Sequence, residues 1–120
     1  SALFDPPYLR GEKPQLSAEA AQRFARIPDV VAQFQPTIER NLAAAADACR
    51  TTSWRYMQLH AELCIRLAAA LEARARGDKE RTVALWRGVK ELLQQNEMAV
   101  QPALDVYEFI DTLERRVINK

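Results

Sequence analysis

One long stretch of the chain without proline limits the possible folds more than any other feature. Six prolines occur at positions 6, 7, 14, 28, 36 and 102, so that the 65 residues 37–101 contain none. Proline removes a backbone donor and disturbs a helix at the residue before it. Alanine supplies 20 of the 120 residues, against 17 for valine, isoleucine and threonine together, which favours helices. We expect an extended lead-in over residues 1–16 and one all-α domain over residues 17–120.

The spacing of apolar residues, mostly three or four, predicts an antiparallel bundle of four to five helices. The first helix is expected to begin at an N-cap on Ser17 and to end near residue 26, before Pro28. A second helical segment is expected to start at residue 29, to break near Gln35 and to continue as a firm helix over residues 37–50.

The longest helix is expected between an N-cap on Ser53 and the glycine at position 77. Apolar side chains cover most of its circumference, so we expect it to lie at the centre of the bundle. Six residues form a narrow polar strip along it: Arg55, Gln58, Glu62, Arg66, Glu72 and Arg76.

Gly77 and Asp78 predict a tight turn into the next helix, which would be the antiparallel neighbour of the longest one. That next helix is expected to bury Val83, Trp86 and Leu93. Gly88 inside it suggests a close approach of two helices, because glycine in a helix costs up to about 1 kcal/mol relative to alanine. The last helix is expected to start near Pro102 and to run to about residue 117.

Charge supports this arrangement and excludes one class of partner. Residues 74–90 carry six basic and two acidic side chains, and residues 92–114 carry five acidic and no basic ones. If the last two helices turn back on each other, Arg87 lies level with Asp111 and Lys90 with Glu108. The net charge of +1 and the lack of aromatic residues placed for base stacking argue against binding of nucleic acid.

No recognisable catalytic, cofactor or metal motif occurs in the sequence. His60, the only histidine, has Met57 and Cys64 at helical spacing, which fits neither zinc nor di-iron motifs. Three carboxylates, Asp105, Glu108 and Asp111, recur every three residues, a pattern that we interpret as a solvated helix face. Three widely separated glycines do not form a nucleotide-binding loop. We therefore expect no cofactor and no catalysis by this chain alone.

Cys49 and Cys64 are expected to stay unpaired. In a hairpin of the helices before and after residues 51–52, the two cysteines lie about 3 and 16 Å from the turn, at 1.5 Å per residue. A disulfide needs Cα atoms within about 7 Å. Both cysteines are interpreted as small core residues, which slightly favours a cytoplasmic location without fixing one. No apolar run reaches the length of a membrane span, so no membrane partner is expected.

Four aromatic residues are candidates for contact with another domain: Phe4, Tyr8, Trp54 and Phe109. Phe4 and Tyr8 are too apolar for a solvated linker. Trp54 lies in the first turn of the expected longest helix, and Phe109 lies outside the apolar stripe of the expected last helix. The chain begins without methionine, which is typical of a segment from a longer protein. The expected partner is therefore the rest of the same polypeptide, and the oligomeric state stays open.

Several segments resemble a known group of proteins. They are SWRYMQLHAE at residues 53–62, ARGD at 75–78, ALW at 84–86 and DVYEF at 105–109. Over residues 30–117 the chain resembles the helical C-terminal region of large bacterial glycoside-hydrolase-like proteins, whose barrel is similar to family 20 β-N-acetylhexosaminidases. The resemblance implies a non-catalytic accessory domain that packs on an upstream barrel. The barrel would hold the catalytic carboxylates, so no catalytic residue is assigned to this chain.

Two other classes remain open. A tetratricopeptide-like interaction module is suggested by the Gly-Asp turn between two helices and by the 32-residue interval between Trp54 and Trp86. The sequences around the two tryptophans do not match each other, which argues against a repeat. A stand-alone enzyme would need a nucleophile, a base and an orienting group at recognisable spacing, and the sequence offers no such set.

Overall fold

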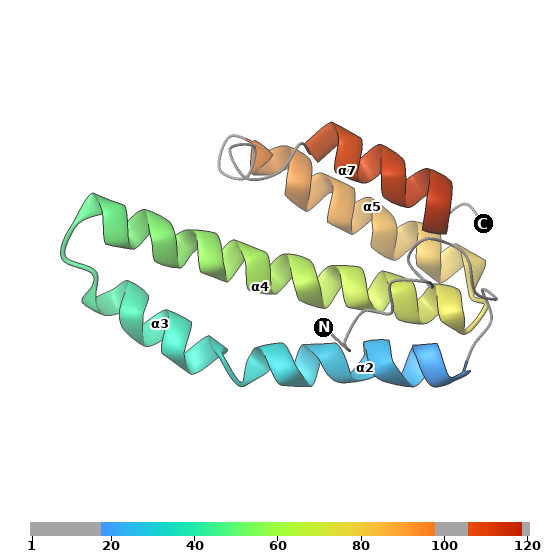
Figure 1. The fold of residues 1–120 in the computed structure, drawn as a ribbon, viewed down its shortest axis with the longest axis horizontal. Coiled ribbons are helices and arrows are strands. Elements are labelled where there is room, and N and C mark those ends of the chain that lie inside the picture. The colour runs from blue at the N-terminus through green and yellow to red at the C-terminus, as the bar shows by residue number, and fades with distance from the viewer. Residues whose placement is uncertain (1–17, 98–105, 119–120) are drawn as a thin grey trace.

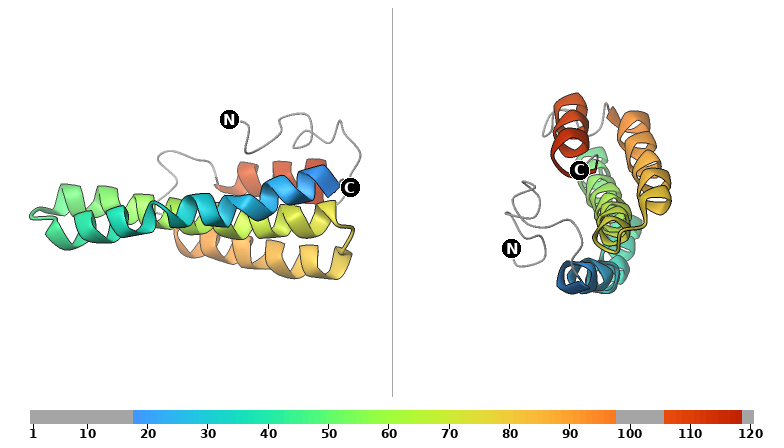
Figure 2. Two further views of the ribbon diagram at one scale, coloured as in Figure 1. Left: turned by 90° about the horizontal axis from the view of Figure 1, so that it is seen from below. Right: turned by 90° about the vertical axis from the view of Figure 1, so that its right-hand side faces the viewer.

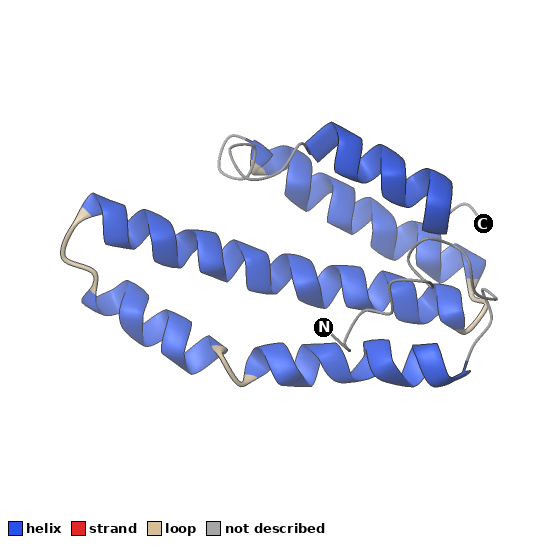
Figure 3. Ribbon diagram, viewed as in Figure 1, coloured by secondary structure: helices blue, strands red, loops and turns tan. Residues whose placement is uncertain are grey.

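The chain forms a bundle of helices with short connections, and the predicted all-α fold is confirmed. The structure is a computed structural model that describes residues 18–97 and 106–118. Within these residues every element is helical (Figure 3). The expected lead-in over residues 1–16, the Ser17 cap and the start of the last helix at Pro102 lie outside the described residues.

Helix α2 (Ala18–Ala32) continues through Pro28, so the prediction that it ends before this proline was wrong. A proline in a helix loses one hydrogen bond and costs about 3 kcal/mol. Burial on both sides of the proline opposes this cost, since Phe24 and Ile27 are 2% and 1% exposed and Val31 packs against the same cluster. The chain turns at Gln33 and Phe34 instead.

Helix α3 (Gln35–Ala44) begins directly after this turn, with Pro36 in its first turn, where no amide donor is needed. The predicted break near Gln35 is thus found two residues earlier, and the predicted helix over 37–50 ends at Ala44. Ile38 is the one buried residue of α3.

Helix α4 (Ala48–Ala75) starts five residues before the predicted Ser53 cap. Asp47 is the N-cap, because its carboxylate accepts a hydrogen bond from the amide of Arg50 at 2.8 Å. Thr51 remains helical and donates its hydroxyl to the carbonyl of Asp47 at 2.9 Å. The aspartate cap, typically worth about 1 kcal/mol, offsets part of the propensity penalty of the Thr-Thr-Ser run, which is up to about 0.7 kcal/mol per residue.

The turn after α4 is the one that the sequence predicted. Gly77 has a φ of 80°, and the amides of Gly77 and Asp78 donate to the carbonyls of Arg74 and Ala73 at 3.0 Å each. These two bonds form a Schellman motif, which needs a residue in the left-handed region. Asp78 then caps α5 (Lys79–Gln95) by accepting from the amide of Arg81 at 3.0 Å.

Helix α4 lies at the centre of the molecule, as predicted. It nearly spans the long axis in a molecule of 48 × 28 × 24 Å (Figure 1). Helices α2 and α3 run along one side of it, while α5 and α7 (Val106–Leu113) cover part of the other side (Figure 2). The chain continues from α7 into a π-helical turn, η1 (Glu114–Ile118).

Two apolar clusters form the core, one on each side of α4. The first joins α2 to the C-terminal half of α4 and includes Val117 of η1. The second gathers Trp86, Val89 and Leu93 of α5 with Ile110 of α7. Two residues, Leu67 and Leu113, pack against both clusters.

The apolar face of α5 differs in one position from the prediction. Val83 is 53% exposed, and Thr82 is buried in its place. Thr82 donates its hydroxyl to the carbonyl of Asp78 at 2.7 Å, so that burying it leaves no unsatisfied donor. Trp86 and Leu93 are buried as predicted.

Candidate functional site

Part of the molecule is only two helices thick. Helix α3 and residues 48–55 of α4 extend beyond α5 and α7, and we call this pair of segments the arm (Figures 1 and 2). The connection between the two helices of the arm is short and consists of Ala45, Ala46 and Asp47. Two exposed apolar side chains lie close to it in sequence: Phe34, the N-cap of α3, is 59% exposed, and Met57 is 47% exposed. Within the arm itself, Ile38 is the one buried residue.

A groove of about 770 Å³ lies where the arm joins the bundle. Its floor is the polar strip of α4 that the sequence analysis identified, from Arg55 through Gln58 and Glu62 to Arg66. Four apolar side chains also line the groove: Leu42 of α3, Leu59 and Ile65 of α4, and Leu92 of α5. Two polar ones, Gln35 of α3 and Asn96 at the end of α5, complete the lining. The walls of the groove are thus mixed and its floor is polar.

The charges in this groove are unequally paired. Arg66 donates to the carboxylate of Glu62 at 2.7 Å, which neutralises both side chains. Arg55 is exposed, and it has no ion pair among the described residues. One unbalanced positive charge therefore remains on the groove floor.

Gly88 of α5 lies next to the groove but does not mark tight packing. A Cβ atom at this position would meet only the guanidinium Nη1 of Arg66, at 3.8 Å. This distance is an ordinary van der Waals contact. The close helix approach suggested by the sequence is thus wrong, and the glycine has no packing role here.

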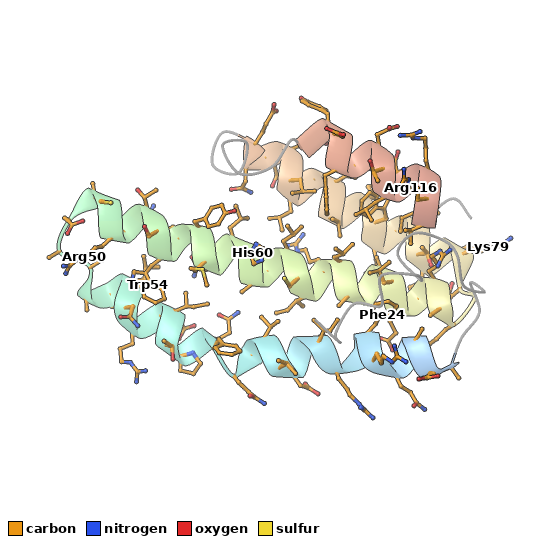
Figure 4. The ribbon with its side chains drawn as sticks, in the orientation of Figure 1. Phe24, Arg50, Trp54, His60, Lys79 and Arg116 are labelled. Atoms are coloured by element: carbon orange, nitrogen blue, oxygen red, sulfur yellow. The ribbon has the colours of Figure 1, made fainter. Side chains whose placement is uncertain are left out.

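The structure places two of the four predicted contact residues, Trp54 and Phe109. Trp54 is half-buried and lies on the side of α4 that faces α3 (Figure 4). It shares this side with Ala61 and Ala68, because residues seven apart lie on one face of a helix. Phe109 is half-buried and packs against the cluster around Trp86. Phe4 and Tyr8 lie outside the described residues, so a contact with another domain stays a prediction for all four.

The polar residues examined as possible catalytic or metal groups do not converge. His60 is exposed on α4, with its ring 6.3 Å from that of Tyr56 and an interplanar angle of 24°. Asp111 binds Arg115 of the same helical segment at 2.8 Å. Within residues 18–97 and 106–118, no group of three or more His, Cys, Asp or Glu side chains could hold a metal ion.

The contact between α5 and η1 includes one carboxylate, that of Glu114, beside the apolar cluster. Glu114 accepts hydrogen bonds through Oε1 from Nε1 of Trp86 at 2.9 Å and from Nζ of Lys90 at 2.8 Å. Lys90 and then Trp86 lower the pKa of the Glu114 carboxyl below its ordinary value of 4.5. The prediction that Lys90 lies level with Glu108 was wrong, because Lys90 pairs with Glu114 instead.

The two cysteines are unpaired, as predicted, but for a different reason. Both belong to α4, and their separation of 15 positions corresponds to about 22 Å along one helix. The predicted hairpin between them was wrong. Cys49 is exposed and not a core residue, whereas Cys64 is half-buried and its burial raises the pKa of its thiol.

Comparison with protein-family models, with curated proteins and with solved structures found no match for this chain. Among the described helices, none has the length and apolar character needed to cross a membrane.

The sequence analysis did not anticipate the exposed Phe34 and Met57. Phe34 belongs to the three-and-four spacing that predicts a buried face, and Pro36, which suits the first turn of a helix, is the signal that a new helix starts just after Phe34. Met57 lies on the same stripe of α4 as Ala61, which is buried, but is itself 47% exposed. Exposure there depends on where the neighbouring helices end.

Proposed function

We propose that residues 1–120 form a non-catalytic helical accessory domain of a larger bacterial, carbohydrate-active protein, and that the domain packs on the catalytic part of the same polypeptide. The observation that supports this proposal is the arm. Its helix α3 has ten residues and buries one of them, Ile38. Helices shorter than about 12–15 residues are marginal by themselves and depend on tertiary packing. A partner on the arm would supply packing that the bundle does not.

The exposed apolar side chains support the same proposal. Phe34 and Met57 would be covered by a partner on the arm, and an interdomain contact of ~600–1,500 Å² would suffice. The carbohydrate-active class of the parent protein rests on the sequence resemblance of residues 30–117 alone. Under that proposal the parent's barrel contains the catalytic carboxylates.

A tetratricopeptide-like module is the second candidate, supported by the tight Gly77–Asp78 turn between antiparallel helices. Such a repeat fits two helices of similar length into 34 residues. Helices α4 and α5 have 28 and 17 residues, which favours an accessory domain over a repeat.

The test uses the natural polypeptide that contains these residues, with and without residues 1–120. We expect removal of the domain to lower the melting temperature of the catalytic part. We expect the double variant Phe34→Ala, Met57→Ala to do so partly, and Val83→Ala, an equally exposed site on α5, to have no effect. Hydrolysis of an aryl N-acetyl-β-glucosaminide by residues 1–120 alone would contradict the proposal. An unchanged melting temperature after removal of the domain would contradict it as well.

A further inference from the structure

We draw no further inference here: the strongest candidate, the groove between α3, α4 and the end of α5, is lined mostly by polar side chains, and nothing in the described part of the structure shows what covers it.

Discussion

The indole Nε1 of Trp86 and the carboxylate Oε1 of Glu114 lie 2.9 Å apart, and this hydrogen bond joins α5 to the first residue of η1. Trp86 is 3% exposed, so its donor would be buried without a partner if Glu114 were absent. The same oxygen binds Lys90 at 2.8 Å. One carboxylate thus satisfies a buried donor and a neighbouring cation together.

Stability should depend on pH through Glu114. The pKa of its carboxyl is lowered in the folded state, so its contribution is present above the ordinary value of 4.5 and is lost as the pH falls through the folded value. We expect Glu114→Gln, which keeps an acceptor for Trp86 but removes the charge, to be less stable than the wild type at pH 7. The difference should shrink below pH 4.5. Urea unfolding from pH 7 to pH 3 measures it, with the exposed Glu39→Gln as the control. A difference that is constant over this range would refute the assignment.

Replacing Gly77 and Gly88 by alanine should change the stability of the protein in opposite directions. Gly88 is helical, and a Cβ there meets only an ordinary contact at 3.8 Å, so Gly88→Ala should stabilise the protein by about 0.5–1 kcal/mol. Gly77 has a φ of 80°, so Gly77→Ala should destabilise it by about 1 kcal/mol or more. Thermal unfolding of the two variants gives the sign directly. A fall in melting temperature for Gly88→Ala would mean that α4 and α5 approach more closely than described.

Alanines allow α2 to pack closely on α4, and a larger side chain between these helices should be costly. Ala21 and Ala68 are fully buried in the same cluster. Ala68→Leu should therefore destabilise the protein by about 1–3 kcal/mol through overpacking. Ala84→Leu on the exposed face of α5 is the matched control and should change stability by less than about 0.5 kcal/mol. Equal effects of the two leucines would show that α2 is not packed on α4 as described.

The two thiols should react at different rates. Cys49 is exposed, whereas Cys64 is half-buried and its burial raises the pKa of its thiol. A smaller fraction of the Cys64 side chain is therefore thiolate at pH 8. We expect iodoacetamide to modify both cysteines without prior reduction, and Cys49 first. Peptide mapping by mass spectrometry over time measures this order. Faster modification of Cys64, or protection of both thiols until a reductant is added, would contradict the structure.

Local signals in the sequence predicted some parts of the fold well. The tight turn at Gly77 and the burial of Trp86 follow from residues within one turn of each position. The prediction of a helix end before Pro28 was wrong, because the burial of Phe24 and Ile27 keeps α2 intact. The prediction of an N-cap on Ser53 was wrong, because the cap at Asp47 starts α4 earlier. Propensity is a weak guide where tertiary packing or a better cap competes with it.

The groove could be predicted only in part. The polar strip from Arg55 to Arg66 is readable from helical periodicity, but periodicity does not show whether a strip faces open solvent or lies between two walls. The walls arise because α3 ends at Ala44 and α5 at Gln95, and both ends depend on caps and turns that the sequence analysis placed several residues away or did not identify. That Arg55 has no ion pair within residues 18–97 and 106–118 could not be predicted either, because helical periodicity does not give the distances between side chains of different helices.

Leu67 and Leu113 contact both apolar clusters, and this sharing has a consequence for how the chain opens. Because these side chains pack in both clusters, disrupting one cluster also removes contacts from the other. The helices around Trp86 and around Phe24 should therefore open as one cooperative unit. Residues 35–55 contribute little to either cluster and can open without breaking this unit. Amide hydrogen exchange should then show two populations: slow amides in α2, α5 and residues 59–75 of α4, which exchange only on global unfolding, and fast ones in α3 and at the start of α4. In the free domain, the part proposed to meet a partner is thus the part that opens at the lowest free energy.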